Sequence, residues 1–115
     1  MRLAVYVGGK ISDDTPEKEE ENLQRIRDLS LEVIRLGHKP FPVGWNSDMG
    51  KDAGFTRQDW YDYDNTWLDR CDVGVFVREG LEESYGAQEE IKRMLNNNQA
   101  VFYGEEEFRE FCDDV

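Results

Sequence analysis

Short apolar runs alternate along the chain with longer segments in which apolar residues recur every three or four positions. The first run, Leu3–Val7, is closed by the turn pair Gly8–Gly9, and similar runs stand at 73–77 and 100–103. Residues 38–43 form a fourth run, which contains two prolines. Short apolar runs bounded by turn residues are typical of buried strands, and a proline removes a donor from the hydrogen-bond ladder of a sheet. The pattern therefore predicts four strands, with 38–43 at a sheet edge.

Three helices are predicted between the strands, and a short helix around residues 108–111 is predicted to end the chain. The first begins after the N-cap Thr15, with a proline in its first turn, and ends before Gly37. The second begins after the cap Thr56, and the third runs over about 85–96. Their expected stripes follow helical spacing and consist of Leu23, Ile26, Leu29, Ser30, Val33 and Ile34 in the first, Trp60, Asp64, Trp67 and Leu68 in the second, and Ala87, Ile91, Met94 and Leu95 in the third.

This alternation of strands and helices favours right-handed βαβ crossovers and a parallel sheet covered on both faces. We predict one α/β domain over residues 1–115, with a Rossmann-like or flavodoxin-like three-layer fold and strand order 2-1-3-4. The ends of the first and third strands then border one crevice, where open α/β sheets bind ligands. The turns after Val7 and Val77 are expected to lie side by side there, and the loop 44–55 is long enough to form a lid.

A strong negative charge narrows the possible partners. The 115 residues carry a formal net charge of -12 at pH 7, with no basic stripe to offset it. Binding to nucleic-acid phosphates or to an anionic membrane is therefore disfavoured, and no apolar run approaches the ~20 residues that cross a bilayer. Cys71 and Cys112 lack metal-ligand spacing and no signal peptide is recognisable, so we expect a cytoplasmic protein with free thiols, no metal and no cofactor. Because so small a subunit often completes its site by self-association, a homodimer or higher homo-oligomer is expected.

Two carboxylates stand out by their positions on the predicted helices. Glu90 lies at the margin of the buried stripe of the third helix, whereas its neighbour Glu89 projects to the solvated side. Asp64 interrupts the apolar stripe of the second helix, and an unpaired buried carboxylate is costly. Other interpretations stay open, because Glu90 could simply interact with the helix macrodipole, and Asp64 could pair with Arg57, Arg70 or a backbone donor.

Other motifs have simpler interpretations. Gly8–Gly9 can be a turn alone, and Lys10 follows it without the spacing of a phosphate-binding P-loop. His38 is expected at the surface, where it begins the edge strand, and the aromatic residues of 60–67 are more typical of a core than of a base-stacking platform. Neither a histidine-based triad nor a metal site is evident.

The order and spacing of several motifs resemble a known superfamily. Tyr6–Gly9 (YVGG) ends the first strand, Asp64 stands eight residues before Asp72, and Ser84–Glu90 (SYGAQEE) follows the third strand. Together they resemble the nucleoside 2-deoxyribosyltransferase superfamily, above all its small uncharacterised branch and the deoxynucleoside 5'-monophosphate N-glycosidases. The resemblance spans the chain from the first strand to the fourth.

The resemblance implies roles for several residues. Glu90 matches the nucleophilic glutamate, which attacks the anomeric carbon and holds the sugar as a glycosyl-enzyme. Asp64 matches the aspartate that protonates or orients the leaving base. Tyr6 and Gly9 match residues that border the base and the sugar, and Gly8 adjoins them. The residue types suit this chemistry, because a carboxylate stabilises or captures a cationic sugar and a protonated base leaves more readily.

A phosphate subsite is implied as well. Ser84, with Gly86, matches the loop that binds the 5'-phosphate in the monophosphate glycosidases, whereas nucleoside transferases tend to have an aspartate there. Exposed amides of Gly86 and Ala87 are expected near the helix start, where they could hold a phosphate or a hydroxyl. Lys10 stands where the glycosidases often have serine, which suggests a phosphate role. After the glutamate, Ile91–Met94 replaces the small apolar residues of the transferases, so helix packing or subunit contacts there are expected to differ.

The expected function is cleavage or transfer at the N-glycosidic bond of a 2'-deoxynucleoside or its 5'-monophosphate, through a glutamate nucleophile. A non-catalytic protein that binds or sequesters a nucleotide in the same pocket is the alternative. A structural subunit without a ligand is a third possibility.

Overall fold

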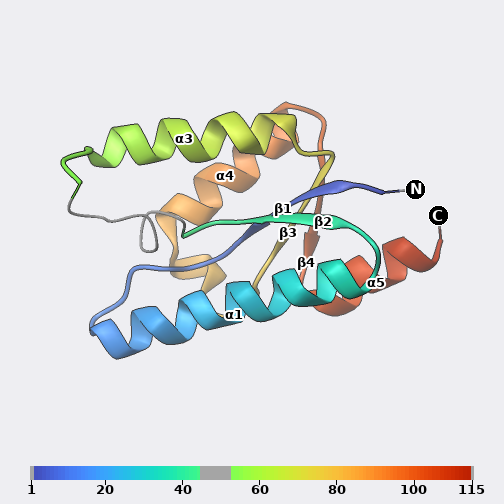
Figure 1. Ribbon diagram of the computed structural model, residues 1–115, viewed down its shortest axis with the longest axis horizontal. Coiled ribbons are helices and arrows are strands. Elements are labelled where there is room, and N and C mark those ends of the chain that lie inside the picture. Colours follow the sequence, from blue (N-terminus) through green and yellow to red (C-terminus); the bar gives the residue numbers. More distant parts are fainter. Residues whose placement is uncertain (1, 45–52, 115) are drawn as a thin grey trace.

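Figure 1 shows the computed structural model, which describes residues 2–44 and 53–114. Four parallel strands form one sheet in the order β2-β1-β3-β4. Their bounds are Ala4–Gly8 for β1, Lys39–Pro42 for β2, Val73–Phe76 for β3 and Ala100–Tyr103 for β4. The sheet confirms the predicted Rossmann-like or flavodoxin-like α/β class, the strand order and the edge position of the proline-containing strand. Most of the predicted lid falls on 45–52, outside the described residues.

Helices cover both faces of the sheet. In Figure 1, α3 and α4 lie on one side of it, and α1 and α5 lie on the other. The bounds are Pro16–Arg35 for α1, Arg57–Arg70 for α3, Leu81–Glu83 for the 3-10 turn η1, Tyr85–Asn96 for α4 and Glu105–Asp113 for α5. Sheet and helices together bury an apolar core that includes Tyr6, Ile26, Val75, Met94 and Phe108.

Side-chain caps explain where three helices begin. The hydroxyls of Thr15 and Thr56 accept hydrogen bonds from backbone amides three residues later, at 3.2 and 3.1 Å. The Thr56 amide also donates to the Asp59 carboxylate at 2.8 Å, which completes a capping box. Ser84 caps α4 in the same way, with its Oγ 3.2 Å from the Ala87 amide. Each cap satisfies a donor that the first helical turn leaves without a partner, and the predicted helix starts are confirmed.

The buried stripes of the helices are narrower than predicted. Ile34 on α1 and Leu95 on α4 are 53% and 54% exposed, and Trp67 on α3 is 44% exposed. These residues lie at the margins of their stripes, and strands of four or five residues offer too little sheet surface to cover them. Leu68 is the buried residue of α3.

His38 is buried, so its predicted surface position is wrong. Its side chain is 5% exposed, and its Nδ1 accepts a hydrogen bond from the Leu3 amide at 3.1 Å. Its ring also meets that of Phe108 edge-on, with centroids 5.8 Å apart. The prediction failed because His38 is packed against Phe108 of α5, which lies seventy residues further along the chain, and local sequence does not reveal such a contact.

Gly8 is expected to tolerate no side chain, because a Cβ there would lie 2.5 Å from a ring carbon of Phe76. Gly8→Ala should lower the free energy of unfolding by about 1–3 kcal/mol, the usual cost of overpacking a core. Urea denaturation followed by circular dichroism measures the change. Gly86→Ala is the matched control, since nothing lies within 4 Å of a Cβ at that position. Unchanged stability of Gly8→Ala would contradict the close packing of Gly8 on Phe76.

Candidate active site

The turns that follow β1 and β3 lie side by side, as predicted. The Val77 amide donates to the Gly8 carbonyl at 3.0 Å, and a Cβ added to Gly9 would lie 3.0 Å from Cβ of Val77. Both turns follow strands of one parallel sheet, so they border the carboxyl edge where such folds bind ligands. The two glycines therefore allow a close approach of the backbone at this edge.

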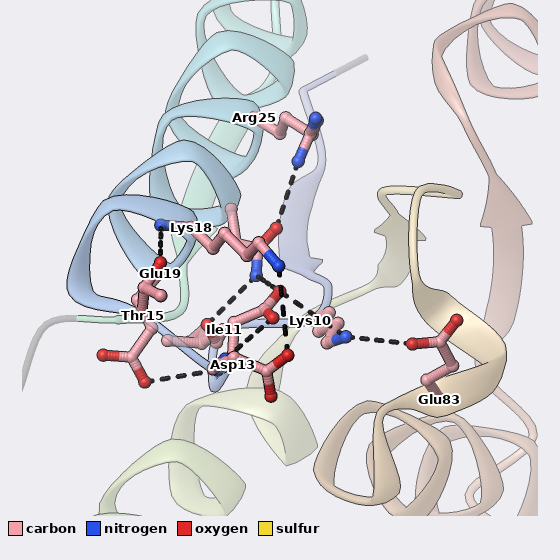
Figure 2. Close-up of polar contacts among 10 residues, drawn as sticks. Lys10, Ile11, Asp13, Thr15, Lys18, Glu19, Arg25 and Glu83 are labelled. Carbon is pink, nitrogen blue, oxygen red and sulfur yellow. Dashed lines mark hydrogen bonds and ion pairs between the residues drawn. The ribbon is translucent and has the colours of Figure 1, made fainter.

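Lys10 connects the β1 turn to the loop before α4. Its Nζ lies 3.1 Å from Glu83 Oε2 and 3.5 Å from Asp13 Oδ2 (Figure 2). The lysine stem crosses Gly80, where a Cβ would lie 2.7 Å from Lys10 Cδ and where φ is +72°. Two carboxylates thus already compensate the Lys10 charge, and a substrate phosphate at this ammonium would have to displace one of them.

Asn22 holds the chain between β1 and α1 in place. This buried side chain donates from Nδ2 to the Ile11 carbonyl at 3.1 Å and to the Asp13 carboxylate at 3.2 Å. Its Oδ1 accepts a hydrogen bond from Arg25 at 3.1 Å. Asn22 therefore holds the Asp13 carboxylate in place, and this carboxylate in turn restrains the ammonium group of Lys10.

Tyr6 and Glu90 are joined by a direct hydrogen bond. Tyr6 projects from β1, is fully buried, and donates its hydroxyl hydrogen to Oε2 of Glu90 in the second turn of α4. The tyrosine ring lies between Phe41 and Phe76, with centroid distances of 5.9 and 6.2 Å. The two neighbouring rings restrict the phenol, so its hydroxyl is held toward α4.

The pKa values of the two predicted carboxyl groups are both raised. Burial raises the pKa of Glu90 to about 7; the Tyr6 hydrogen bond opposes this rise, and the negative charge of Asp64 adds to it. Burial also raises the pKa of Asp64 to about 6. The pKa of Tyr6 is raised well above its ordinary value, chiefly by burial and then by the charges of Glu90 and Asp64. The Tyr6 hydroxyl therefore keeps its hydrogen and remains a donor near neutral pH. Both carboxyl groups have pKa values close to neutral pH, so each can gain or lose a proton there.

Asp64 on α3 lies close enough to affect the pKa of both Tyr6 and Glu90. It is partly buried, and within the described part of the chain its side chain forms no hydrogen bond and no ion pair. Pairing with Arg57 or Arg70 is therefore not formed, and Arg70 donates instead to the carbonyl of its own helix at Thr66, at 3.3 Å. Glu89, by contrast, is exposed beside Lys92, as helical phase predicted. α3 and α4 thus bring two carboxylates together near the Tyr6 hydroxyl.

The start of α4 offers fewer free amides than predicted. The Ala87 amide donates to Ser84 Oγ, and Ala87 is buried, so the expectation of an exposed amide there is wrong. The cap formed by Ser84 is the physical reason, because an N-cap hydroxyl bonds the amide three residues later. Gly86 has open space where a Cβ would stand, which leaves room for a ligand beside its backbone.

Phe41 and Trp67 extend the site in a way that motif spacing does not predict. Phe41 pairs with Tyr6 in the β1–β2 register, stacks on Trp67 at a centroid distance of 5.6 Å and contacts Tyr63 at 6.2 Å. Tyr63 and Trp67 belong to the same helix as Asp64 and stand one position before it and three positions after it. The sequence does contain a signal, because β1 and β2 each contain an aromatic residue, Tyr6 and Phe41. That the two rings are neighbours follows only when the register of the two strands is known.

A separate groove of about 610 Å³ lies between α1 and α5. It is lined by charged side chains that include Glu32, Arg35, Arg78 and Glu105. Arg35 lies 3.3 Å from Glu32, and Arg78 lies 3.1 Å from Glu107. These two arginines are therefore paired with carboxylates, and the groove contains none of the predicted site residues.

No protein-family model matches this chain, and no curated protein is significantly similar to it in sequence. Among the described residues, no group of His, Cys, Asp and Glu side chains is arranged to hold a metal ion. No helix in residues 2–44 and 53–114 combines the length and apolar character needed to cross a membrane. Functional inference therefore depends on the chemistry of Tyr6, Asp64 and Glu90 themselves.

Tyr6→Phe is expected to raise the pKa of Glu90 further, because the lost hydrogen bond favours the ionised carboxylate. A hydrogen bond to a charged group contributes about 1.5–3 kcal/mol, or roughly one to two pKa units. Carboxyl-carbon NMR titration of Glu90 measures this shift without requiring catalysis. Tyr61→Phe, which changes an exposed tyrosine on α3, is the control and should leave the titration unchanged. A Glu90 titration that does not move in Tyr6→Phe would contradict the importance of this bond.

Proposed function

We propose that the protein cleaves or transfers at the N-glycosidic bond of a 2'-deoxynucleoside or its 5'-monophosphate, with Glu90 as the nucleophile. The observation that supports this most directly is the hydrogen bond from Tyr6 to Glu90, together with the effect of the Asp64 charge on the pKa of both groups, under the two helices that cover one face of the parallel sheet. A carboxylate nucleophile with a second carboxyl group as acid and base is the set of groups used to form and hydrolyse a glycosyl-enzyme.

In the first step, the ionised carboxylate of Glu90 attacks the anomeric carbon. Tyr6 donates to Oε2, which leaves Oε1 for the attack. As the bond between Oε1 and C1' forms, the bond between C1' and the base nitrogen breaks, and its electron pair goes to the base. Because the pKa of Asp64, about 6, lies below that of Glu90, about 7, this step uses the minor form of the pair in which the proton is on Asp64. In that form Asp64 gives its proton to the departing base, while the negative charge of Glu90 stabilises the developing cation on the sugar.

In the second step, water or another base attacks C1' of the glycosyl-enzyme. Asp64, now ionised, takes the proton from the attacking group, and the bond between C1' and Oε1 breaks. The Glu90 carboxylate and the protonated Asp64 are thereby restored. Water releases the free sugar or its phosphate, whereas a second base gives a new nucleoside.

A panel of deoxynucleosides and their 5'-monophosphates, each with and without an acceptor base, tests the proposal. Chromatography should detect free base or a new nucleoside from at least one substrate. Mass spectrometry of the quenched enzyme should find the sugar on the peptide that contains Glu90. Absence of base release from every substrate between about pH 5 and 8, where both carboxylates titrate, would contradict the proposal. Tight binding of a deoxynucleotide without turnover would support the nucleotide-binding alternative.

A further inference from the structure

The position of α3 determines where Asp64 stands, yet this helix has little apolar anchoring. Leu68 is its buried residue, and Tyr63 and Trp67 contact Phe41, although Trp67 remains 44% exposed. In Figure 1, α3 lies alongside α4, the helix that carries Glu90. The separation of Asp64 and Glu90 therefore depends on how these two helices are joined.

Polar side chains join the C-terminal halves of the two helices. Arg93 of α4 donates from Nε and Nη2 to the two carboxylate oxygens of Asp69 on α3, at 2.8 and 2.6 Å. Asn97 donates to the same carboxylate at 2.9 Å and to Gln99 Oε1 at 3.1 Å. Gln99 donates in turn to the carbonyls of Leu68 and Cys71, at 2.7 and 2.8 Å. We call Asp69, Arg93, Asn97 and Gln99 the α3–α4 clamp.

The geometry of the clamp is better suited to fixing the orientation of α3 relative to α4 than to stabilising the folded protein. The side chains of Arg93 and Asp69 are 44% and 39% exposed, and ion pairs so exposed contribute little to folding. Their two parallel hydrogen bonds nevertheless fix the relative orientation of two helices, which a single contact would not do. Arg93 follows Glu90 by three residues and so stands almost one helical turn beyond it, while Asp69 follows Asp64 by five.

We propose that the α3–α4 clamp is a positioning device that sets the separation of Asp64 and Glu90. Its effect on turnover rests on the proposed function, whereas its effect on the two carboxylates does not. Neither Arg93 nor Asp69 is proposed to touch the substrate.

Arg93→Gln removes the paired hydrogen bonds, and Arg93→Lys keeps the charge but loses the planar fork. Since small displacements of reacting groups reduce rates strongly, kcat should fall about 10–100-fold in Arg93→Gln, with a smaller change in KM. Exchange of the partners in the double variant Asp69→Arg with Arg93→Asp should recover part of kcat. Arg109→Gln, which breaks an exposed pair with Glu32 between α5 and α1, is the control and should keep the parental kcat.

Carboxyl-carbon NMR titration of Asp64 and Glu90 supplies a readout that does not need turnover. Loosened helices admit water and separate the two charges, so both pKa values should fall toward their ordinary range in Arg93→Gln and stay unchanged in Arg109→Gln. Parental titration curves in a folded Arg93→Gln, verified by circular dichroism, would overturn the positioning role. If the parental protein releases no base from any substrate, the proposed function fails while this titration still decides the role of the clamp.

Discussion

Glu90→Gln is expected to lower kcat for base release at least about 10³-fold, because an amide cannot serve as a nucleophile toward the anomeric carbon. Glutamine has nearly the same shape as glutamate, and its side-chain oxygen can still accept the Tyr6 hydroxyl. The loss should therefore reflect chemistry and not misfolding. Initial rates with saturating substrate, measured by chromatography of the released base, provide the test.

The adjacent glutamate supplies the matched control. Glu89 is exposed and lies 3.5 Å from Lys92, so Glu89→Gln removes the same charge from the same helix without touching the site. Its kcat should stay within about 2-fold of the parent, since exposed pairs of this kind contribute little. Equal rates in Glu90→Gln and the parent would remove Glu90 from the mechanism, and a large loss in Glu89→Gln would show that helix charge, not nucleophilicity, is being measured.

The same Glu90→Gln protein is expected to be more stable than the parent in alkaline solution. The folded-state pKa of Glu90 is raised from its ordinary 4.5 to about 7, so the folded protein holds a proton that the unfolded chain releases between these values. The contribution of this proton to stability is present in full below about pH 4.5 and is lost as the pH rises through about 7. Glutamine does not titrate and avoids that loss.

Urea denaturation at two pH values measures the difference. Relative to the parent, Glu90→Gln should gain about 2–3 kcal/mol in free energy of unfolding between about pH 4 and pH 8. Glu89→Gln serves again as the control for removal of one negative charge from an acidic protein, and its difference from the parent should stay small throughout. A gain that is the same at both pH values, or a loss at pH 8, would show that the Glu90 carboxyl is not held in its neutral form by the fold.

Local signals account for the parts of the fold that could be predicted. Thr15, Thr56 and Ser84 begin helices because a hydroxyl at the N-cap bonds an amide three residues later, and this requires no distant contact. The edge position of β2 follows from the chemistry of Pro40 and Pro42 alone. Alternating strands and helices limit the topology to right-handed crossovers, from which the parallel sheet follows.

Contacts between distant segments account for what could not be predicted. Helical phase placed Glu90 at the margin of one buried stripe and Asp64 within another, but the hydrogen bond from Tyr6 joins residues 84 positions apart. Lys10 likewise meets Glu83, 73 positions away, which changes it from a free cation into a paired one. The burial of His38 depends on the docking of α5. Such features arise from three-dimensional packing, which periodicity does not encode.

The prolines of β2 determine whether the outer edge of the sheet can pair with a further strand. The amides of Lys39 and Val43 point inward and donate to the carbonyls of Leu3 and Val7 around β1, so the amides of the alternate positions would point outward. Those positions are Pro40 and Pro42, which have no amide hydrogen. The outer edge of β2 therefore cannot template another strand there, and this side of the molecule is protected against edge-to-edge aggregation.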